Sequence, residues 1–222
     1  MIKNQAIQNP HRTWCPRLQS WLQEAYRDAG RPGDTVHDTR DFAILPKRLF
    51  ELVGSLSQTK KYDFCFIGSF AIRPAVVKSR GWILPFIRRK FGPQSFLQFT
   101  DSITRRDHKL FGPYDRTKSH IGFVPREEPM AERGYLDKNY YQVMSESLFT
   151  LCPAGDDPWS MRFYEALVCR SIPIVNSFSE AARTPKEAQL GYKFLTTNSE
   201  FVFREDWVEH NYAIVRNNHS LL

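Results

Sequence analysis

The stretch Ser147–Val175 constrains the fold of this chain more than any other part of the sequence. Ser147–Cys152 is a short run of apolar residues and β-formers, which is typical of a buried strand, and Ile172–Val175 is a second such run. Turn-forming residues separate the first run from a helical pattern that begins at Trp159. Asp157 is the expected N-cap of that helix, because a proline follows it at the first helical position. The stretch therefore predicts one βαβ unit whose loop follows the carboxyl end of a strand.

Such a loop is where an open α/β sheet binds ligands, because free backbone N–H groups and the helix dipole both point at it. Arg162 and Glu165 are three residues apart, so they share one face near the start of the predicted helix. An arginine there can bind a pair of phosphate groups, and a carboxylate one turn later can accept two ribose hydroxyls. The pair therefore suits a nucleoside diphosphate, although the spacing also fits an Arg–Glu pair on the surface of an ordinary helix.

The same stretch resembles the sugar-donor motif of the exostosin-like glycosyltransferases, family 47. That motif reads as a strand, P-x-G, S-x-R-x-x-E-A and I-P-V/I, and the matching residues here are Pro153, Gly155, Ser160, Arg162, Glu165, Ala166, Ile172, Pro173 and Ile174. The longer form, CPAGDDPWSMRFYEAL with SIPIV, is most similar to the small glycosyltransferases of large algal viruses and their hosts. The resemblance covers residues 62–217, strongly at 147–175 and loosely elsewhere. It implies an α/β fold with a Rossmann-like parallel sheet, equivalent to the donor-binding half of a two-domain GT-B enzyme.

The resemblance also implies an activity: inverting transfer of a sugar from a nucleoside-diphosphate sugar to a hydroxyl of a glycan or glycoprotein acceptor. Arg162 and the helix start at Ser160 would stabilise the charge of the leaving diphosphate, and Glu165 would hold the ribose. Arg80 matches a family arginine that helps to hold the donor phosphates, although its basic surroundings equally fit a solvated cation. The full set of expected donor-binding residues is Gly68, Ser69, Arg80, Pro153, Gly155, Asp157, Ser160, Arg162 and Glu165.

Inversion also needs a base that deprotonates the acceptor hydroxyl. Asp38, Asp41 and Asp156 are the candidates, and Asp38 is favoured because a base is expected on the acceptor side. The first two belong to HDTRD, a segment that could equally cap or solvate a turn. We expect no metal ion and no cofactor. The expected donor is a UDP-sugar, and UDP-xylose is the first candidate. The second candidate is a guanosine-based donor, GDP-fucose.

Strands and helices alternate from Tyr62 to Thr196, which predicts a single parallel sheet. Tyr62–Ser69 is the clearest strand outside the central stretch, and its Gly-Ser end suits a first Rossmann-like strand that meets a phosphate-side loop. A helical segment after Arg73 is expected to be interrupted at Gly81 and Pro85. Further strands are expected at 96–100, 121–125 and 192–196, and helices at 17–29, 46–56, 140–146, 180–190 and 205–217.

We expect residues 58–222 to form the nucleotide-sugar-binding domain, with an insertion at about 102–139 that contacts the acceptor. Residues 1–57 would form a helical acceptor-side segment. The roughly 60 residues before Tyr62 are too few for a second Rossmann domain. The acceptor half of the GT-B architecture would then be either reduced to this segment and the insertion or supplied by a partner chain. A homodimer is a further possibility for the oligomeric state.

The net charge of +7 suits an anionic ligand. The excess is spread out and no RRM or helix-turn-helix motif accompanies it, so we expect no nucleic-acid partner. No apolar run reaches the roughly 18 residues of a membrane span, and no signal peptide is visible. These observations favour the cytoplasm, or the host cytoplasm if the protein is viral.

The cysteines, Cys15, Cys65, Cys152 and Cys169, are isolated in the sequence, which predicts buried reduced thiols rather than a metal cluster or a disulfide framework. Two other functions stay open beside glycosyl transfer. One is a nucleotide-sugar-binding subunit without activity, and the other is a basic nucleic-acid-binding protein.

Overall fold

Five parallel strands form one sheet in this computed structural model, which describes residues 45–68, 80–99, 136–154, 159–181 and 185–220. The strands lie in the order β2-β1-β3-β4-β5, and each neighbouring pair is parallel. Their bounds are β1 (Tyr62–Gly68), β2 (Phe96–Phe99), β3 (Ser147–Leu151), β4 (Ile172–Val175) and β5 (Leu195–Thr196). The predicted α/β fold with a Rossmann-like parallel sheet is confirmed.

The strand order reverses between β1 and β3. From β1 the chain moves outward to β2, then returns to the other side of β1 and continues through β3, β4 and β5. Cys65 of β1 pairs with Thr150 of β3, so the carboxyl ends of these two strands lie next to each other. In open α/β sheets the crevice at such a reversal, beyond the carboxyl ends of the strands, is where ligands bind.

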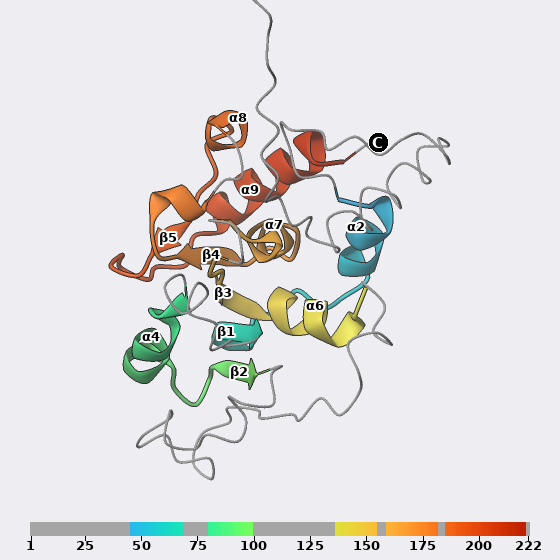
Figure 1. Ribbon diagram of the computed structural model, residues 1–222. Helices are drawn as coiled ribbons and strands as arrows, with labels where there is room; N and C mark the ends of the chain where they lie inside the picture. The colour runs from blue at the N-terminus through green and yellow to red at the C-terminus, as the bar shows by residue number, and fades with distance from the viewer. Residues whose placement is uncertain (1–44, 69–79, 100–135, 155–158, 182–184, 221–222) are drawn as a thin grey trace, which may run out of the picture.

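Helices cover both faces of the sheet. Figure 1 shows α2, α6 and α7 on one side of the strands and α4 on the other, with α9 packed along α7. The helices are α2 (Lys47–Gly54), α4 (Ile83–Lys90), α6 (Lys138–Ser145), α7 (Met161–Val168), α8 (Pro185–Ala188) and α9 (Glu205–Asn218). The predicted helices at 46–56 and 205–217 are confirmed, and the one predicted at 140–146 begins two residues earlier, after the N-cap Asp137.

Two apolar cores result, one on each face. In β1, Cys65 and Ile67 face the core shared with α2, α6 and α7, whereas Phe64 and Phe66 face the core shared with α4. This alternation is the two-residue period of a strand. Because both faces are covered, the strands read as nearly continuous apolar runs, and every residue of β4 is buried.

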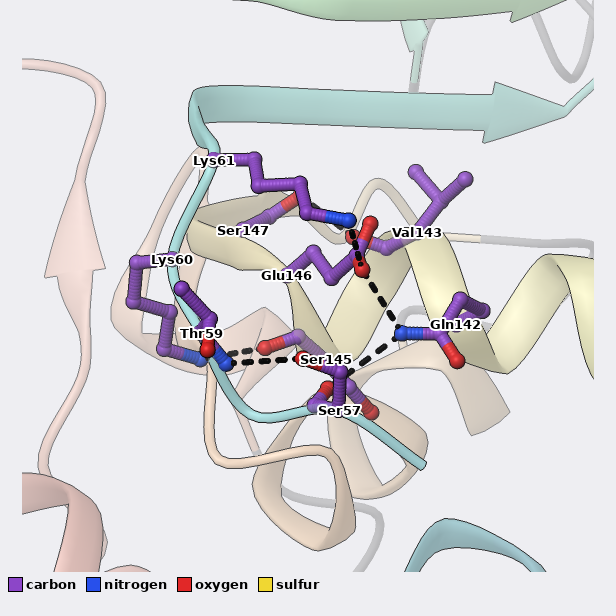
Figure 2. Close-up of polar contacts among 9 residues, drawn as sticks. All are labelled: Ser57, Thr59, Lys60, Lys61, Gln142, Val143, Ser145, Glu146 and Ser147. Carbon is purple, nitrogen blue, oxygen red and sulfur yellow. Dashed lines mark hydrogen bonds and ion pairs between the residues drawn. The ribbon is translucent and has the colours of Figure 1, made fainter. Parts of the chain in front are cut away.

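The amino edge of the sheet is held together by lysines. Lys60 Nζ donates to the carbonyl oxygens of Ser145 at 2.8 Å and Arg170 at 2.7 Å, at the carboxyl ends of α6 and α7. Those carbonyls have no partner inside their helices and carry partial negative charge. Lys61 pairs with Glu146 at 2.5 Å (Figure 2). These contacts fix α6 and α7 to the edge opposite the predicted ligand site.

Arg170 ends α7 in the left-handed conformation, with φ at 56°. A non-glycine residue in this conformation costs about 1–2 kcal/mol. The N–H groups of Arg170 and Ser171 bond back to carbonyls of the last turn at 3.2 and 2.9 Å, which is a Schellman ending. The Arg170 guanidinium then bonds Glu209 at 2.6 Å and lies over the Tyr212 ring at 4.4 Å, so the turn also joins α7 to α9.

Prolines account for two wrong predictions. The predicted helix at 180–190 is wrong: the structure has a 3₁₀ helix, Phe178–Glu180, and a short α8 that begins at Pro185. Proline lacks the N–H that would continue a helix into this position. Pro85, by contrast, does not interrupt α4, because it lies in the first turn, where backbone N–H groups have no partner within the helix.

Several other predictions end differently or lie outside the described residues. The last strand is shorter than expected and consists of Leu195–Thr196. The predicted helix at 17–29, the strand at 121–125, most of the 102–139 insertion and Cys15 lie outside the described residues. The domain division at residue 57 stays a prediction; α2, from the first segment, packs into the same core as α6 and α7.

Candidate functional site

The candidate site lies where the carboxyl ends of β1 and β3 meet. Gly68 is the last residue of β1, and the chain passes from β3 through Ala154 toward the start of α7. Arg162 leaves the first turn of α7, and its guanidinium reaches across to Gly68. The strand reversal therefore brings together residues nearly a hundred positions apart in the sequence.

Ser160 begins α7. Its backbone is extended, at φ −140° and ψ 138°, and its Oγ accepts a hydrogen bond from the Arg162 N–H at 3.2 Å. The prediction that Asp157 caps a helix beginning at Trp159 is wrong, because α7 begins at Met161. Ser160 supplies the side-chain oxygen that a helix start requires. The cap makes Arg162 the second helical residue and sets the direction in which its side chain leaves the helix.

The Arg162 guanidinium is buried against β1. It lies over the ring of Phe66, 5.2 Å from the ring centre. Nε and Nη1 are fully buried, and among the described residues they have no hydrogen-bond partner. A buried N–H group without a partner costs about 1–3 kcal/mol. These two donors are therefore available to an acceptor that the described residues do not supply.

Arg162 keeps its positive charge despite this burial. Burial lowers the pKa of the guanidinium, but the nearby Tyr140, Cys152 and Glu165 outweigh that effect and raise the pKa above its ordinary value. The site therefore combines a fixed positive charge, two available N–H donors and the start of a helix, and this combination suits an anionic group.

Glu165 is completely buried, with no exposed surface. Its Oε2 accepts a hydrogen bond of 2.5 Å from the Tyr140 hydroxyl of α6. This burial rules out the alternative that Arg162 and Glu165 form a pair on a solvated helix surface. The expected role of Glu165 as a ribose ligand stays a prediction.

A second arginine reaches the same loop. Arg80, which precedes α4, is half-buried, and its Nε donates to the Ala154 carbonyl at 3.1 Å. The side chain is thus attached to the end of β3, which disagrees with the alternative of a solvated cation. Pro153, the neighbour of Ala154, is buried. The structure brings together Gly68, Arg80, Pro153, Ser160, Arg162 and Glu165 of the predicted donor-binding set.

The remaining predicted site residues cannot be placed. Ser69, Gly155 and Asp157 of the donor-binding set lie outside the described residues, as do the three candidate bases Asp38, Asp41 and Asp156. Their roles stay predictions.

The three described cysteines, Cys65, Cys152 and Cys169, are free and buried, as predicted. Burial raises the pKa of each thiol, so none is poised as a nucleophile. Within the described ranges, no group of three His, Cys, Asp or Glu side chains could hold a metal ion. In the same part of the chain, no helix has the length and hydropathy needed to cross a bilayer.

Two contributors to the site were missed by sequence reasoning. Phe66 supplies the ring beneath Arg162, and its alternation with Cys65 and Ile67 identified it only as a core residue. Tyr140 supplies the hydroxyl that meets Glu165, and no motif marks it. The available signal was its place on the buried side of a short helix directly before β3.

Comparisons with known proteins agree with this geometry. Residues 98–201 match the family model of the Exostosin GT47 domain. A stretch of 36 residues is 50% identical to a probable glucuronosyltransferase of Oryza sativa subsp. japonica, and it covers 16% of this chain and 9% of the rice protein. No solved structure matches the chain.

Proposed function

We propose that this chain, which carries an exostosin GT47 domain, transfers a sugar from a nucleoside-diphosphate sugar to a hydroxyl of a glycan acceptor, with inversion. The observation that carries the proposal is Arg162, whose buried Nε and Nη1 lack partners among the described residues at the β1–β3 reversal. The negatively charged oxygens of a diphosphate are strong acceptors for guanidinium N–H groups.

The proposed reaction breaks the bond between the anomeric carbon and the diphosphate oxygen. The bonding electrons stay on that oxygen, so negative charge develops on the diphosphate, and Arg162 and the start of α7 stabilise it. Arg80 adds a second positive charge at the same loop. The acceptor hydroxyl attacks the opposite side of the anomeric carbon while a base, Asp38 in first place, takes its proton.

Two lines of support point to different sugars. The similarity of the central motif to glycosyltransferases of algal viruses favours UDP-xylose, with GDP-fucose second. The rice relative is named a probable glucuronosyltransferase, which adds UDP-glucuronic acid. We propose a UDP-sugar as the donor and the cytoplasm as the site of action, the host cytoplasm if the protein is viral.

A nucleotide-sugar-binding subunit without activity is the second candidate function. It rests on the same donor-side residues, Arg162 and Arg80, which could bind a diphosphate whether or not transfer follows. Such a subunit would bind the donor with the same residues but would need a partner chain for transfer.

Calorimetric titration with UDP, GDP, UDP-xylose, UDP-glucuronic acid and UDP-glucose tests the site. We expect the cognate diphosphate to bind, and Arg162→Ala to weaken it by about 1.5–3 kcal/mol, the range for hydrogen bonds to charged groups. Arg162→Lys should recover only part of the loss, because lysine keeps the charge without the fork. Arg89→Ala, which removes an exposed arginine of α4, is the control. Equal binding by folded Arg162→Ala and the native protein would exclude the phosphate role.

Transfer to an added glycan then separates the two candidates. An enzyme releases UDP from its donor in the presence of acceptor, whereas a binding subunit leaves the donor intact until a partner is added. Transfer should continue when EDTA is present, because the proposed charge stabilisation uses arginines. Complete loss of transfer in EDTA would contradict the expected independence from metal.

A further inference from the structure

A buried hydrogen-bonded chain joins α6 to α7 beneath the candidate site. Tyr140 of α6 donates to Glu165 Oε2 at 2.5 Å. Tyr140 also acts on Arg162, because a hydrogen bond from the guanidinium to the Tyr140 side chain is among the causes that raise the pKa of Arg162. The tyrosine hydroxyl thus stands between the arginine and the glutamate, accepting from one and donating to the other.

All three members of this chain are removed from water. Tyr140 is 7% exposed and Glu165 is fully buried, and the Nε and Nη1 atoms of Arg162 are buried as well. Hydrogen bonds that involve charged groups are the strong ones, and a low local dielectric strengthens them further. Buried contacts inside the protein therefore restrict the orientation of the Arg162 side chain.

We propose that Tyr140 is a positioning residue of the nucleotide-diphosphate site. Its hydroxyl holds the Arg162 guanidinium against Phe66 and Gly68, which leaves Nε and Nη1 available to an incoming phosphate. This inference rests on the proposed function. Without the hydroxyl, the long arginine side chain would have to be ordered by the ligand, and that ordering lowers affinity.

Tyr140 can do this because α6 is itself fixed at both ends. Asp137 caps its start by accepting from the N–H groups of Asn139 and Tyr140, at 3.0 and 3.2 Å. At its other end, Lys60 binds the Ser145 carbonyl at 2.8 Å (Figure 2). Because α6 is fixed in this way, the Tyr140 hydroxyl has a defined position relative to the sheet and to Arg162.

The protein contains a second buried tyrosine that serves as a matched control for Tyr140. Tyr164 of α7 donates from its hydroxyl to Oε2 of Glu187, also at 2.5 Å, and both residues are fully buried. The chemistry equals that of Tyr140 and Glu165, and the burial is similar, because Tyr140 is 7% exposed and Tyr164 has no exposed surface. The Tyr164 hydroxyl, however, bonds to Glu187 of α8 instead of Glu165, and the Tyr164 ring packs against Tyr192 and His219. Losing either hydroxyl should affect folding similarly, whereas only Tyr140 should affect the ligand.

The test is the UDP affinity of Tyr140→Phe and Tyr164→Phe, each in the native background and in Arg162→Ala. We expect Tyr140→Phe to weaken UDP binding about tenfold and Tyr164→Phe to leave it unchanged. In the Arg162→Ala background, Tyr140→Phe should cause no further loss, because residues that act through one another are not additive. Comparable melting temperatures for the two phenylalanine variants would exclude a loss through unfolding.

The outcomes distinguish a failure of the Tyr140 inference from a failure of the proposed function on which it rests. If the native protein binds no diphosphate, the proposed function fails and the role of Tyr140 fails with it. If binding depends on Arg162 but both phenylalanine variants bind as the native protein does, only the Tyr140 inference is wrong. An equal loss for Tyr140→Phe with and without Arg162 would also overturn it. If Tyr140→Phe does not fold, Tyr140→Met and Tyr164→Met, which also remove the hydroxyl, replace the pair in the same comparison.

Discussion

The Arg162 guanidinium occupies the space that a side chain at position 68, at the end of β1, would need. A Cβ atom at position 68 would lie 2.7 Å from Nη2 of Arg162 and 3.4 Å from its Cζ. Gly191 is the described glycine with a positive φ, so Gly68 is required for room rather than for backbone conformation. The bare backbone at the end of β1 is what allows the guanidinium to lie over Phe66.

Gly68→Ala should therefore move Arg162 without breaking the sheet. The conflicting atom is the far end of a long side chain, which can rotate away more easily than the backbone can shift. We expect the variant to fold and to bind UDP about tenfold more weakly, which is about 1.4 kcal/mol. Calorimetry measures the affinity and thermal unfolding measures the stability.

Gly92→Ala is the control for this substitution, because a Cβ there meets nothing within 4 Å. Its affinity for UDP should equal that of the native protein. Native affinity in folded Gly68→Ala would mean that the observed position of Arg162 is not needed for binding.

Arg80→Ala should weaken UDP binding less than Arg162→Ala does. Arg80 is half-buried, with its Nε bonded to the Ala154 carbonyl, so solvent screens its charge more than that of the buried Arg162. Calorimetry at low and high salt should show the Arg80 contribution shrinking as salt rises. Arg89→Ala removes the same charge from the exposed side of α4 and should leave the UDP affinity unchanged at both low and high salt. An effect of Arg80→Ala as large as that of Arg162→Ala would contradict this ranking.

The sheet and the central motif could be predicted because their signals are local. The apolar runs that became β1, β3 and β4 stand between turn-forming residues, and the family motif placed Arg162 and Glu165 on one helix. Parallel strands that are covered on both faces leave such runs in the sequence.

The parts of the site that were missed depend on tertiary contacts. Tyr140 is separated from Glu165 by 25 residues, and only the packing of α6 against α7 brings them together. The clearance at Gly68 likewise depends on the Arg162 side chain reaching from α7 to the end of β1. At the start of α7, Asp157 and Ser160 are both good N-caps by residue type, so propensity alone did not decide between them.

Ser160→Ala should destabilise the start of α7. The Ser160 hydroxyl accepts from the Arg162 N–H at 3.2 Å, and loss of a serine N-cap costs about 0.5–2 kcal/mol of unfolding free energy. Urea unfolding measures this change. Ser160→Asp retains an acceptor and adds a negative charge at the helix start, so it should preserve stability but weaken UDP binding by repulsion. Native stability in Ser160→Ala would show that the cap is not needed.

Lys60 and Lys61 are neighbours with opposite pKa shifts. Burial lowers the pKa of Lys60 to about 8, against an ordinary value of 10.5. The hydrogen bond to Glu146 instead raises the pKa of Lys61. A neutral Lys60 amine still has two N–H groups for the carbonyls of Ser145 and Arg170, so its deprotonation need not break the amino edge.

These shifts predict an unusual dependence of stability on pH. Between about pH 8 and pH 10.5 the unfolded chain holds a proton at Lys60 that the folded chain has released, so rising pH favours the folded state. The unfolding free energy of the native protein, relative to Lys60→Met, should therefore be flat below about pH 8 and then increase toward pH 10. Urea unfolding of both proteins across this range measures the difference. Lys61→Met is the control. The pKa of Lys61 is raised, so this amine stays protonated in the folded protein across the range tested. The difference in unfolding free energy between the native protein and Lys61→Met should therefore stay flat. A difference that falls with pH for Lys60→Met would mean that attraction between the charged amine and the two helix ends outweighs the cost of burying the charge.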